Sequence, residues 1–247
     1  MANTHPILLT PSTHVFVLTG AGISAESGIA TFRDAGGLWE GHRPEDVASP
    51  EAWAKDPAMV WRFYSERRRK AANALPNAGH LALAKLEREL DPGHLFLCTQ
   101  NVDGLHEAAG STAFHMHGEL FKTRCENPGC VVQPFDDHLH YFDVLPTCER
   151  CGAKLRPHIV WFGEEPFGMT RIKREAQSCD LFVTIGSSGV VYPAAGLVRE
   201  ILYRRQMGDD CRAVYVGPEE PANASSFQDV RLGNAGDVLP TLFEVER

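Results

Sequence analysis

The chain has 247 residues with a formal net charge of −8, and 43% of its residues are hydrophobic. This length allows one large domain, or one domain with a smaller insert, around a substantial core. The acidic balance disfavours a broad nucleic-acid-binding surface, and no apolar run is long enough to span a bilayer. Residues 1–13 lack the basic and apolar segments of a signal peptide. We therefore expect a cytoplasmic protein that contacts neither nucleic acid nor membrane, and a monomer because no long apolar face is left unassigned.

The first predicted element is a short apolar strand at residues 15–18, followed by a glycine-rich turn. Residues 20–25 (GAGISA) match the Gly-x-Gly-x-x-Ala form of the dinucleotide-binding fingerprint and predict a helix start. In that motif the glycines let the backbone approach a pyrophosphate, which the N–H groups of the helix start then bind. A purely structural turn is an equally good interpretation. No acidic residue ends a second strand about 20 residues later, so the layout differs from that of ordinary dehydrogenases.

Residues 26–39 are rich in glycine and contain Phe32 and Arg33, which suits either a mobile lid over a cofactor or a plain surface loop. Residues 44–74 favour helices, with Asp56 as an N-cap before a proline. Tyr64 and Arg67 are three residues apart and therefore share a helix face. Taken alone, the basic run at residues 67–70 is more typical of a solvated face.

The densest group of polar residues follows the next predicted strand. A helix at residues 81–90 precedes an apolar strand at 95–98, and the strand leads into residues 99–106 (TQNVDGLH) and 115–118 (HMHG). The carboxyl ends of parallel strands are where open α/β sheets bind ligands. Any one of these residues could belong to an ordinary polar loop. The set as a whole, together with the glycine-rich turn and the cysteines below, indicates a functional site.

Four cysteines have the spacing of a metal site. Two are separated by four residues, seventeen residues follow, and the last two are separated by two residues: Cys125, Cys130, Cys148 and Cys151. This pattern predicts a structural zinc bound by four thiolates, with a folding contribution on the order of 10 kcal/mol. The remaining cysteines lie in or beside apolar segments and are expected to be buried and inert: Cys98, Cys179 and Cys211.

The rest of the chain alternates between strands and helices. Residues 181–185 form an unbroken apolar strand, typical of a parallel sheet that is buried on both faces, and it ends in a small-residue loop at 186–189. We also expect a helix at 172–178, a helix ending near residue 205, a strand at 213–216 and a closing helix at 237–247.

Taken together, the motifs closely resemble the sirtuin family of NAD-dependent protein deacylases, from about residue 15 to the C-terminus. The matching segments occur in this order: GAGIS at 20–24, FRD at 32–34, residues 99–106, HG at 117–118, the four cysteines, VWFGE at 160–164 and GSSGVVYP at 186–193. The resemblance implies an α/β fold with a Rossmann-like parallel sheet. It implies that residues 1–34, 76–121 and 157–247 form the NAD-binding domain. Residues 35–75 then form the helical part, and residues 122–156 the zinc-binding part, of a smaller domain.

The resemblance also implies residue roles. His117 is expected to be the general base, and Gln100 and Asn101 to face the nicotinamide-side ribose, where Asn101 also positions a water. Val102 and Asp103 are expected to hold the nicotinamide carboxamide. The other cofactor contacts fall on Gly20, Ala21, Gly22, Phe32, Arg33, Gly186, Ser187, Ser188 and Ala235.

In the implied reaction, the carbonyl oxygen of an acyl-lysine attacks ribose C1′ as nicotinamide leaves, and His117 accepts a proton from the ribose hydroxyls. The products are free lysine, nicotinamide and O-acyl-ADP-ribose, and zinc is structural. The substrate is an acylated-lysine protein or peptide, which binds as an added strand. Its expected contacts are Val160, Phe162, Gly163 and Val190.

The Tyr-x-x-Arg spacing of Tyr64 and Arg67 matches the sirtuin subgroup that removes succinyl and malonyl groups. A guanidinium and a hydroxyl that converge on one point suit a terminal carboxylate. The alternatives are an enzyme that is mainly a deacetylase, an NAD-dependent protein ADP-ribosyltransferase, and a non-catalytic module that binds NAD or acyl-lysine. Binding alone needs neither His117 nor Asn101, which argues against the module. The sequence departs from the family at Ser187, where threonine is usual, and near Gly217, where an adenosine-side asparagine is common.

Overall fold

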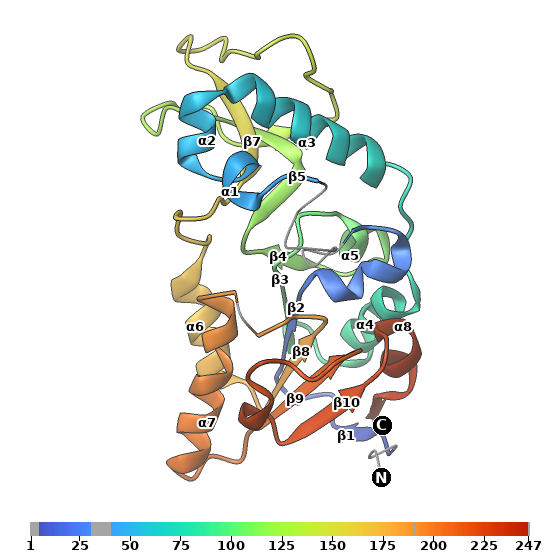
Figure 1. Ribbon diagram of the computed structural model, residues 1–247. Helices are drawn as coiled ribbons and strands as arrows, with labels where there is room; N and C mark the ends of the chain where they lie inside the picture. The colour runs from blue at the N-terminus through green and yellow to red at the C-terminus, as the bar shows by residue number, and fades with distance from the viewer. Residues whose placement is uncertain (1–4, 31–40, 190, 247) are drawn as a thin grey trace.

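The computed structural model describes residues 5–30, 41–189 and 191–246. Within them, six parallel strands form the main sheet (Figure 1). From one edge to the other they are β10 (Asp229–Leu232), β9 (Arg212–Gly217), β8 (Leu181–Ile185), β2 (Val15–Thr19), β3 (Leu95–Thr99) and β4 (Ala113–His115). The expected α/β class with a Rossmann-like parallel sheet is confirmed.

Helices cover both faces of this sheet, and residues of β2 alternate between the two cores. Val15 and Val17 face the core that contains α4 (Ala78–Glu89) and α8 (Ala235–Val238). Phe16 and Leu18 face the core that contains α6 (Met169–Ser178) and α7 (Val198–Gln206). Because side chains of a strand alternate between faces, a strand buried on both sides needs an unbroken apolar run.

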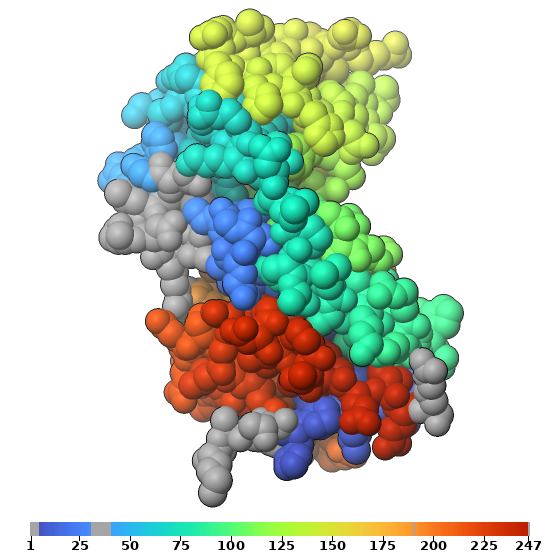
Figure 2. Space-filling model, turned by 90° about the vertical axis from the view of Figure 1, so that its right-hand side faces the viewer, coloured from blue at the N-terminus to red at the C-terminus, as the bar shows by residue number. Residues whose placement is uncertain are grey.

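The smaller domain combines three helices with an antiparallel sheet. Its helices are α1 (Pro44–Val47), α2 (Pro50–Lys55) and α3 (Pro57–Ala71), and its strands lie in the order β6 (Phe135–Asp136), β5 (Gly118–Cys125) and β7 (Leu155–Ile159). The three helices share one core with β5 and β7. They lie at the end of the molecule opposite the chain termini (Figures 1 and 2). The expected N-cap is confirmed, because Asp56 Oδ1 accepts a hydrogen bond from the Met59 N–H at 2.8 Å.

Arg68 joins the helices of this domain to its sheet. The side chain is fully buried, although it belongs to a basic run that alone suggests a solvated face. Its guanidinium donates to the carbonyl oxygens of Leu120 and Leu139, both at 2.8 Å, and pairs with Asp137 at 3.2 Å. One arginine therefore satisfies carbonyl groups of two segments that follow it by about fifty to seventy residues.

The expected closing helix at residues 237–247 is wrong. After the single turn of α8, a 3₁₀ turn at Leu239–Thr241 leads into β11 (Phe243–Val245), which pairs in parallel with β1 (Ile7–Leu9). A proline at position 240 cannot donate an intrahelical hydrogen bond. Phe243 and Val245 instead pack against the core beside α4.

The other predicted helices and strands differ from the structure only in where they begin or end, and the elements not yet described are short. Helix α4 begins at residue 78 rather than 81, because Asn77 caps it. The remaining short elements are two 3₁₀ turns (Ala21–Ile23 and Ala25–Ser27), α5 (Leu105–Ala108), and 3₁₀ turns at Ala194–Gly196 and Ala224–Ser226. In the described part of the chain, no helix has the length and apolar character needed to cross a membrane.

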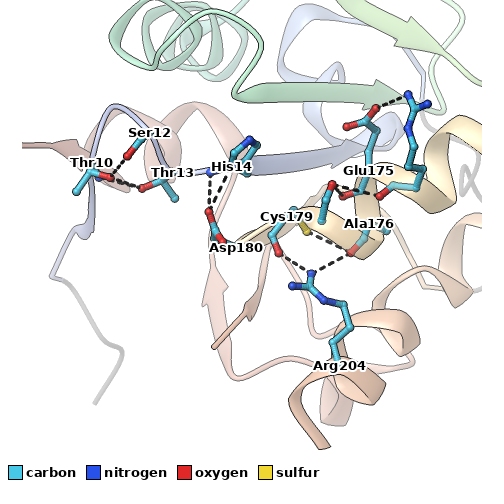
Figure 3. A network of polar contacts seen from close by, with 11 residues as sticks. Thr10, Ser12, Thr13, His14, Glu175, Ala176, Cys179, Asp180 and Arg204 are labelled. Atoms are coloured by element: carbon cyan, nitrogen blue, oxygen red, sulfur yellow. Dashed lines mark hydrogen bonds and ion pairs between the residues drawn. The ribbon is translucent and has the colours of Figure 1, made fainter. Parts of the chain in front are cut away.

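Polar contacts also tie together the amino ends of β2 and β8 (Figure 3). The Asp180 carboxylate accepts the backbone N–H of His14 at 2.8 Å. Arg204 of α7 donates to the carbonyl oxygens of Ala176 and Cys179 at the end of α6, at 3.2 and 2.6 Å. These contacts lie at the amino ends of the strands. The predicted site residues gather at the opposite, carboxyl ends.

Candidate active site

Two glycine-containing loops pack against each other at the carboxyl ends of β2 and β8. Gly20 N donates to Ile185 O, and Gly22 N donates to Gly186 O, both at 2.9 Å. A Cβ on Gly22 would lie only 2.7 Å from Gly186 Cα, and one on Gly20 only 2.8 Å from Gly186 O. Glycine is therefore needed at these positions for a reason other than approach to a pyrophosphate, because the backbones of the two loops are in contact. The expected helix start is wrong in detail, because two 3₁₀ turns, beginning at Ala21 and Ala25, stand in place of an α-helix.

A directed chain of hydrogen bonds orients Asn101. Its amide nitrogen donates to Gly20 O at 3.2 Å and to Ser24 Oγ at 3.1 Å. Ser24 in turn donates to Asp103 Oδ2 at 3.0 Å, and all three side chains are buried. Because both amide hydrogens are used inside the protein, Asn101 presents its amide oxygen as its remaining polar group. Our sequence reasoning missed Ser24, although it lies within the quoted 20–24 motif.

Gln100 and His117 connect the neighbouring loops. The Gln100 amide donates to Ser187 Oγ at 3.1 Å and so joins the loops that follow β3 and β8. His117 Nδ1 lies 3.1 Å from Gln100 O. A carbonyl can only accept, so this contact assigns the ring proton to Nδ1 and leaves Nε2 as a base. Burial lowers the pKa of His117 despite the opposing effect of the Gln100 carbonyl, so the ring is neutral near pH 7.

His115 binds the next carbonyl along the same segment. Its Nδ1 lies 3.0 Å from Asn101 O, and its Nε2 lies 3.1 Å from the Glu107 carboxylate. Burial opposes protonation, but the hydrogen bond and charge of Glu107 outweigh it and raise the pKa of His115. Two imidazoles therefore bind consecutive carbonyls, on either side of the buried Met116.

The third histidine of the polar segment, His106, is structural. It is fully buried, and its Nε2 lies 3.0 Å from Thr19 Oγ1. Burial, with a smaller contribution from His80, lowers the pKa of His106 to about 3. The rings of His80 and His106 meet edge to face at 4.9 Å. A group so resistant to protonation cannot serve as a general base near neutral pH.

Tyr64 and Arg67 lie close together on α3. Tyr64 is fully buried, and its hydroxyl accepts the indole N–H of Trp161 at 3.1 Å. Burial raises the pKa of Tyr64 to about 12, against the opposing charge of Arg67. Arg67 lines a cavity of about 330 Å³. The other residues that line it are His42, Met59, Arg62, Phe63, Glu66, Lys70 and Phe142.

The segment at residues 160–163 lies beside His117. Val160 N donates to His117 O at 2.9 Å, and Phe162 N donates to Ala48 O at 3.0 Å. Gly163 has φ +90°, a conformation that favours glycine. Phe162 is 43% exposed.

The remaining predicted residues are less closely tied to these groups. Val102 O accepts Leu120 N at 2.7 Å, and Ser188 O accepts Ala222 N at 3.2 Å. Ala21 opens the first 3₁₀ turn, and Ala235, buried at the start of α8, packs near Gly79. Three predicted site residues lie outside the described residues: Phe32, Arg33 and Val190.

The four predicted metal-binding cysteines converge. Their sulfur atoms all lie within 4.8 Å of one another, with 3.5 Å between those of Cys125 and Cys151 and 3.8 Å between those of Cys130 and Cys148. These distances are far longer than a disulfide bond of about 2.05 Å. Zn–S bonds of about 2.3 Å in a tetrahedron place the sulfurs about 3.8 Å apart. The cluster therefore fits one structural zinc, and the other three cysteines are buried as expected.

Comparisons with known proteins agree with this geometry. The model of the Sir2 family matches residues 20–193. An NAD-dependent protein deacylase of Vibrio cholerae is 49% identical over 237 residues, which cover 95% of this chain and 93% of the relative. The NAD-dependent protein deacylase SIR2rp3 of Trypanosoma brucei brucei is 53% identical over 235 residues, with 93% of each chain covered.

Solved structures give the same result. A Sir2 homologue in complex with NAD has a TM-score of 0.80 and 38% identity, and the match covers 96% of this chain and 94% of that one. An ADP-ribose complex of a Sir2 homologue mutant has a TM-score of 0.82 and 40% identity, with 93% and 90% covered. The resemblance to the sirtuins is confirmed, and the chain belongs to the Sir2 family.

Proposed function

We propose that this chain is an NAD-dependent protein-lysine deacylase that prefers acyl groups with a terminal carboxylate, such as succinyl and malonyl, and also removes acetyl. Its relatives are named NAD-dependent protein deacylases. The observation that carries the acyl preference is the fully buried Tyr64 hydroxyl beside the half-buried Arg67, whose positive charge acts on it. The set of residues around His117 supports the chemistry.

The residues present fit NAD. Gly20, Gly22 and Gly186 carry no side chains and present backbone alone where β2 and β8 end, and the neighbouring polar groups of Asn101 and His117 suit a ribose. When bound, NAD supplies a ribose carbon made electrophilic by departure of nicotinamide. The Asn101 amide oxygen is positioned to accept a hydrogen bond from a ribose hydroxyl. His117 Nε2, neutral because burial lowers the pKa of the ring, is the base that accepts the proton. General-base catalysis typically accelerates a reaction by about 10²- to 10⁴-fold.

The acyl preference follows from two neighbouring hydrogen-bond donors. The Tyr64 hydroxyl accepts from Trp161, and within residues 5–30, 41–189 and 191–246 it has no acceptor for its own proton. The guanidinium of Arg67 is close enough to act on the pKa of that hydroxyl. A buried O–H beside a cation is an environment that favours an anion. A carboxylate at the end of the acyl chain meets this requirement, and the methyl group of an acetyl does not.

The test is Arg67→Met, measured as kcat/KM on one lysine peptide that carries either succinyl or acetyl. We expect the succinyl value to fall by about 30- to 1,000-fold, which corresponds to roughly 2–4 kcal/mol for removal of one partner of a buried charge pair. The acetyl value should survive. Arg62→Met is the matched control, because Arg62 lines the same cavity from the same helix and is half-exposed. An unchanged succinyl rate in Arg67→Met would contradict the acyl preference.

The same assay separates the alternative activities. A deacylase releases nicotinamide only with acylated peptide and transfers the acyl group, whereas an ADP-ribosyltransferase labels protein and leaves the acyl group in place. A binding module releases no nicotinamide. We further propose that the chain acts as a monomer on acylated-lysine proteins. Light scattering at the assay concentration tests this, and a dimer mass would contradict it.

A further inference from the structure

The direction of the Tyr64 hydroxyl is set by a residue outside the predicted acyl site. Trp161 is almost fully buried, and its Nε1–H donates to Tyr64 Oη at 3.1 Å. An indole nitrogen can only donate. The phenolic proton therefore cannot point at Trp161 and must point elsewhere. We propose that Trp161 is a specificity-determining positioning residue, whose indole N–H makes Tyr64 a hydrogen-bond donor to the acyl carboxylate.

The indole of Trp161 is held in one orientation by an ion pair. The Arg156 guanidinium lies 3.4 Å from the ring centroid, over its face. Arg156 also makes two hydrogen bonds to the Glu164 carboxylate, at 2.7 and 2.9 Å. Glu164 accepts the backbone N–H of Trp161 at 2.8 Å. The ring of Trp53 lies at 5.7 Å. The ring and the backbone are both fixed, so the indole N–H stays aimed at Tyr64.

This arrangement strengthens the phenol as a donor while keeping it protonated. A hydroxyl that accepts one hydrogen bond becomes a better donor in the next, because the bonds polarise one another in a low-dielectric interior. Burial keeps the pKa of Tyr64 near 12, so the hydroxyl retains its proton at working pH. The resulting order is indole N–H to phenol oxygen, then phenol O–H to carboxylate. This order of hydrogen bonds stabilises a bound acyl group that ends in a carboxylate. A neutral acetyl group has no acceptor for the phenol proton.

The inference rests on the proposed function, and Trp161→Phe tests it. Phenylalanine keeps an aromatic ring in the core and removes the N–H. We expect kcat/KM on the succinyl peptide to fall roughly 5- to 20-fold, as for the loss of one buried hydrogen bond. The acetyl value should stay within about 2-fold, because the lost donor acts only through Tyr64. The KM for NAD should not change.

A double-mutant cycle separates this role from packing. If Trp161 acts through Tyr64, then Trp161→Phe causes no further loss of succinyl preference in a Tyr64→Phe background. Trp53→Phe is the matched control. Phenylalanine keeps an aromatic ring beside Trp161 and removes only an indole N–H that donates to Glu126 at 2.8 Å, so the succinyl-to-acetyl ratio should be unchanged.

The outcomes distinguish failure of this inference from failure of the proposed function. A wild-type enzyme without succinyl preference would refute the acyl preference itself. A wild-type preference that persists in Trp161→Phe would overturn the role of the indole alone. Equal losses on both peptides, or additive losses with Tyr64→Phe, would show that Trp161 only supports packing.

Discussion

We predict that His106 makes the protein less stable as the pH falls. The ring is fully buried, with its Nε2 against the hydroxyl of Thr19 and its face near His80. Burial lowers the pKa of His106 from 6.5 to about 3. Below pH 6.5 the unfolded chain therefore binds a proton at this ring that the folded protein does not bind until about pH 3. Stability must rise with pH across this window and fall on acidification.

The size of the effect follows from the two pKa values of His106. At pH 5 protonation of His106, with its ordinary pKa of 6.5, lowers the free energy of the unfolded state. The folded state, in which the pKa is about 3, is almost unprotonated and gains almost no free energy. One pKa unit corresponds to about 1.4 kcal/mol, so about 2 kcal/mol is lost between pH 7.5 and pH 5. This amount is a large fraction of the stability of a typical domain, which is about 5–15 kcal/mol.

The assay is urea unfolding of the wild type and of His106→Gln at pH 7.5 and 5.0. Whatever the substitution costs at pH 7.5, the variant should lose about 2 kcal/mol less than the wild type on acidification. His115→Gln is a control of opposite sign. Because Glu107 raises the pKa of His115, its protonation stabilises the fold below pH 6.5, and this contribution is lost as the pH rises. Its removal should therefore increase the loss on acidification. An identical pH dependence in His106→Gln and the wild type would refute the reasoning.

Three further predictions concern the fold around the site. Removal of zinc with a chelator should unfold the module of β5, β6 and β7, lower the melting temperature and abolish deacylation. Readdition of zinc should restore the melting temperature and the activity. Activity that is unaffected by complete loss of the metal would contradict this prediction. Gly22→Ala should cost about 1–3 kcal/mol in thermal unfolding, because its Cβ would meet the backbone of Gly186, whereas Gly104→Ala, with open space around it, should cost much less. Arg68→Met should cost about 3–5 kcal/mol in urea unfolding, since it leaves the buried Asp137 unpaired. Adding Asp137→Asn should recover part of that loss, and a neutral Arg68→Met would contradict the assigned role.

The central strands could be predicted from the sequence because burial on both faces leaves a local signature. The apolar runs at residues 15–18, 95–98, 181–185 and 213–216 all lie in the middle of the sheet. The edge strand β10 could not be found this way. It contains Asp229 and Arg231, which are buried because they pair with each other at 2.9 Å. That ion pair is visible only in the folded structure. In the sequence, the two charged residues make the segment look like an exposed loop.

The closing segment was mispredicted for a related reason. Residues 243–245 become a strand only because residues 7–9 lie beside them, more than two hundred residues away in sequence. Local pattern cannot reveal such a partner. The basic run on α3 shows the same limit, since its adjacent residues Arg67 and Arg68 differ: Arg67 lines a cavity, whereas Arg68 is fully buried.

For the site, short motifs were enough to identify the groups that the loops after β2, β3 and β8 bring together. Gln100, Asn101 and His117 do lie within one network of hydrogen bonds. Ser24 and Trp161 were missed, although both stand inside quoted motifs. Their partners lie 79 and 97 residues away in the chain. A serine and a tryptophan have many ordinary uses, and only the folded chain shows what each one faces.

In the proposed function, the chemistry and the choice of acyl group depend on different parts of the fold. Asn101 and His117 are fixed by groups of the loops that follow β2 and β3, whereas Tyr64 is fixed by Trp161 and the core of the smaller domain. The two sets meet where Val160 N donates to His117 O. Because that contact is between main-chain groups, substitutions in the acyl pocket can change selectivity without moving the base. This separation is why acetyl turnover should survive in variants of the pocket, whereas loss of His117 should abolish turnover of every acyl group.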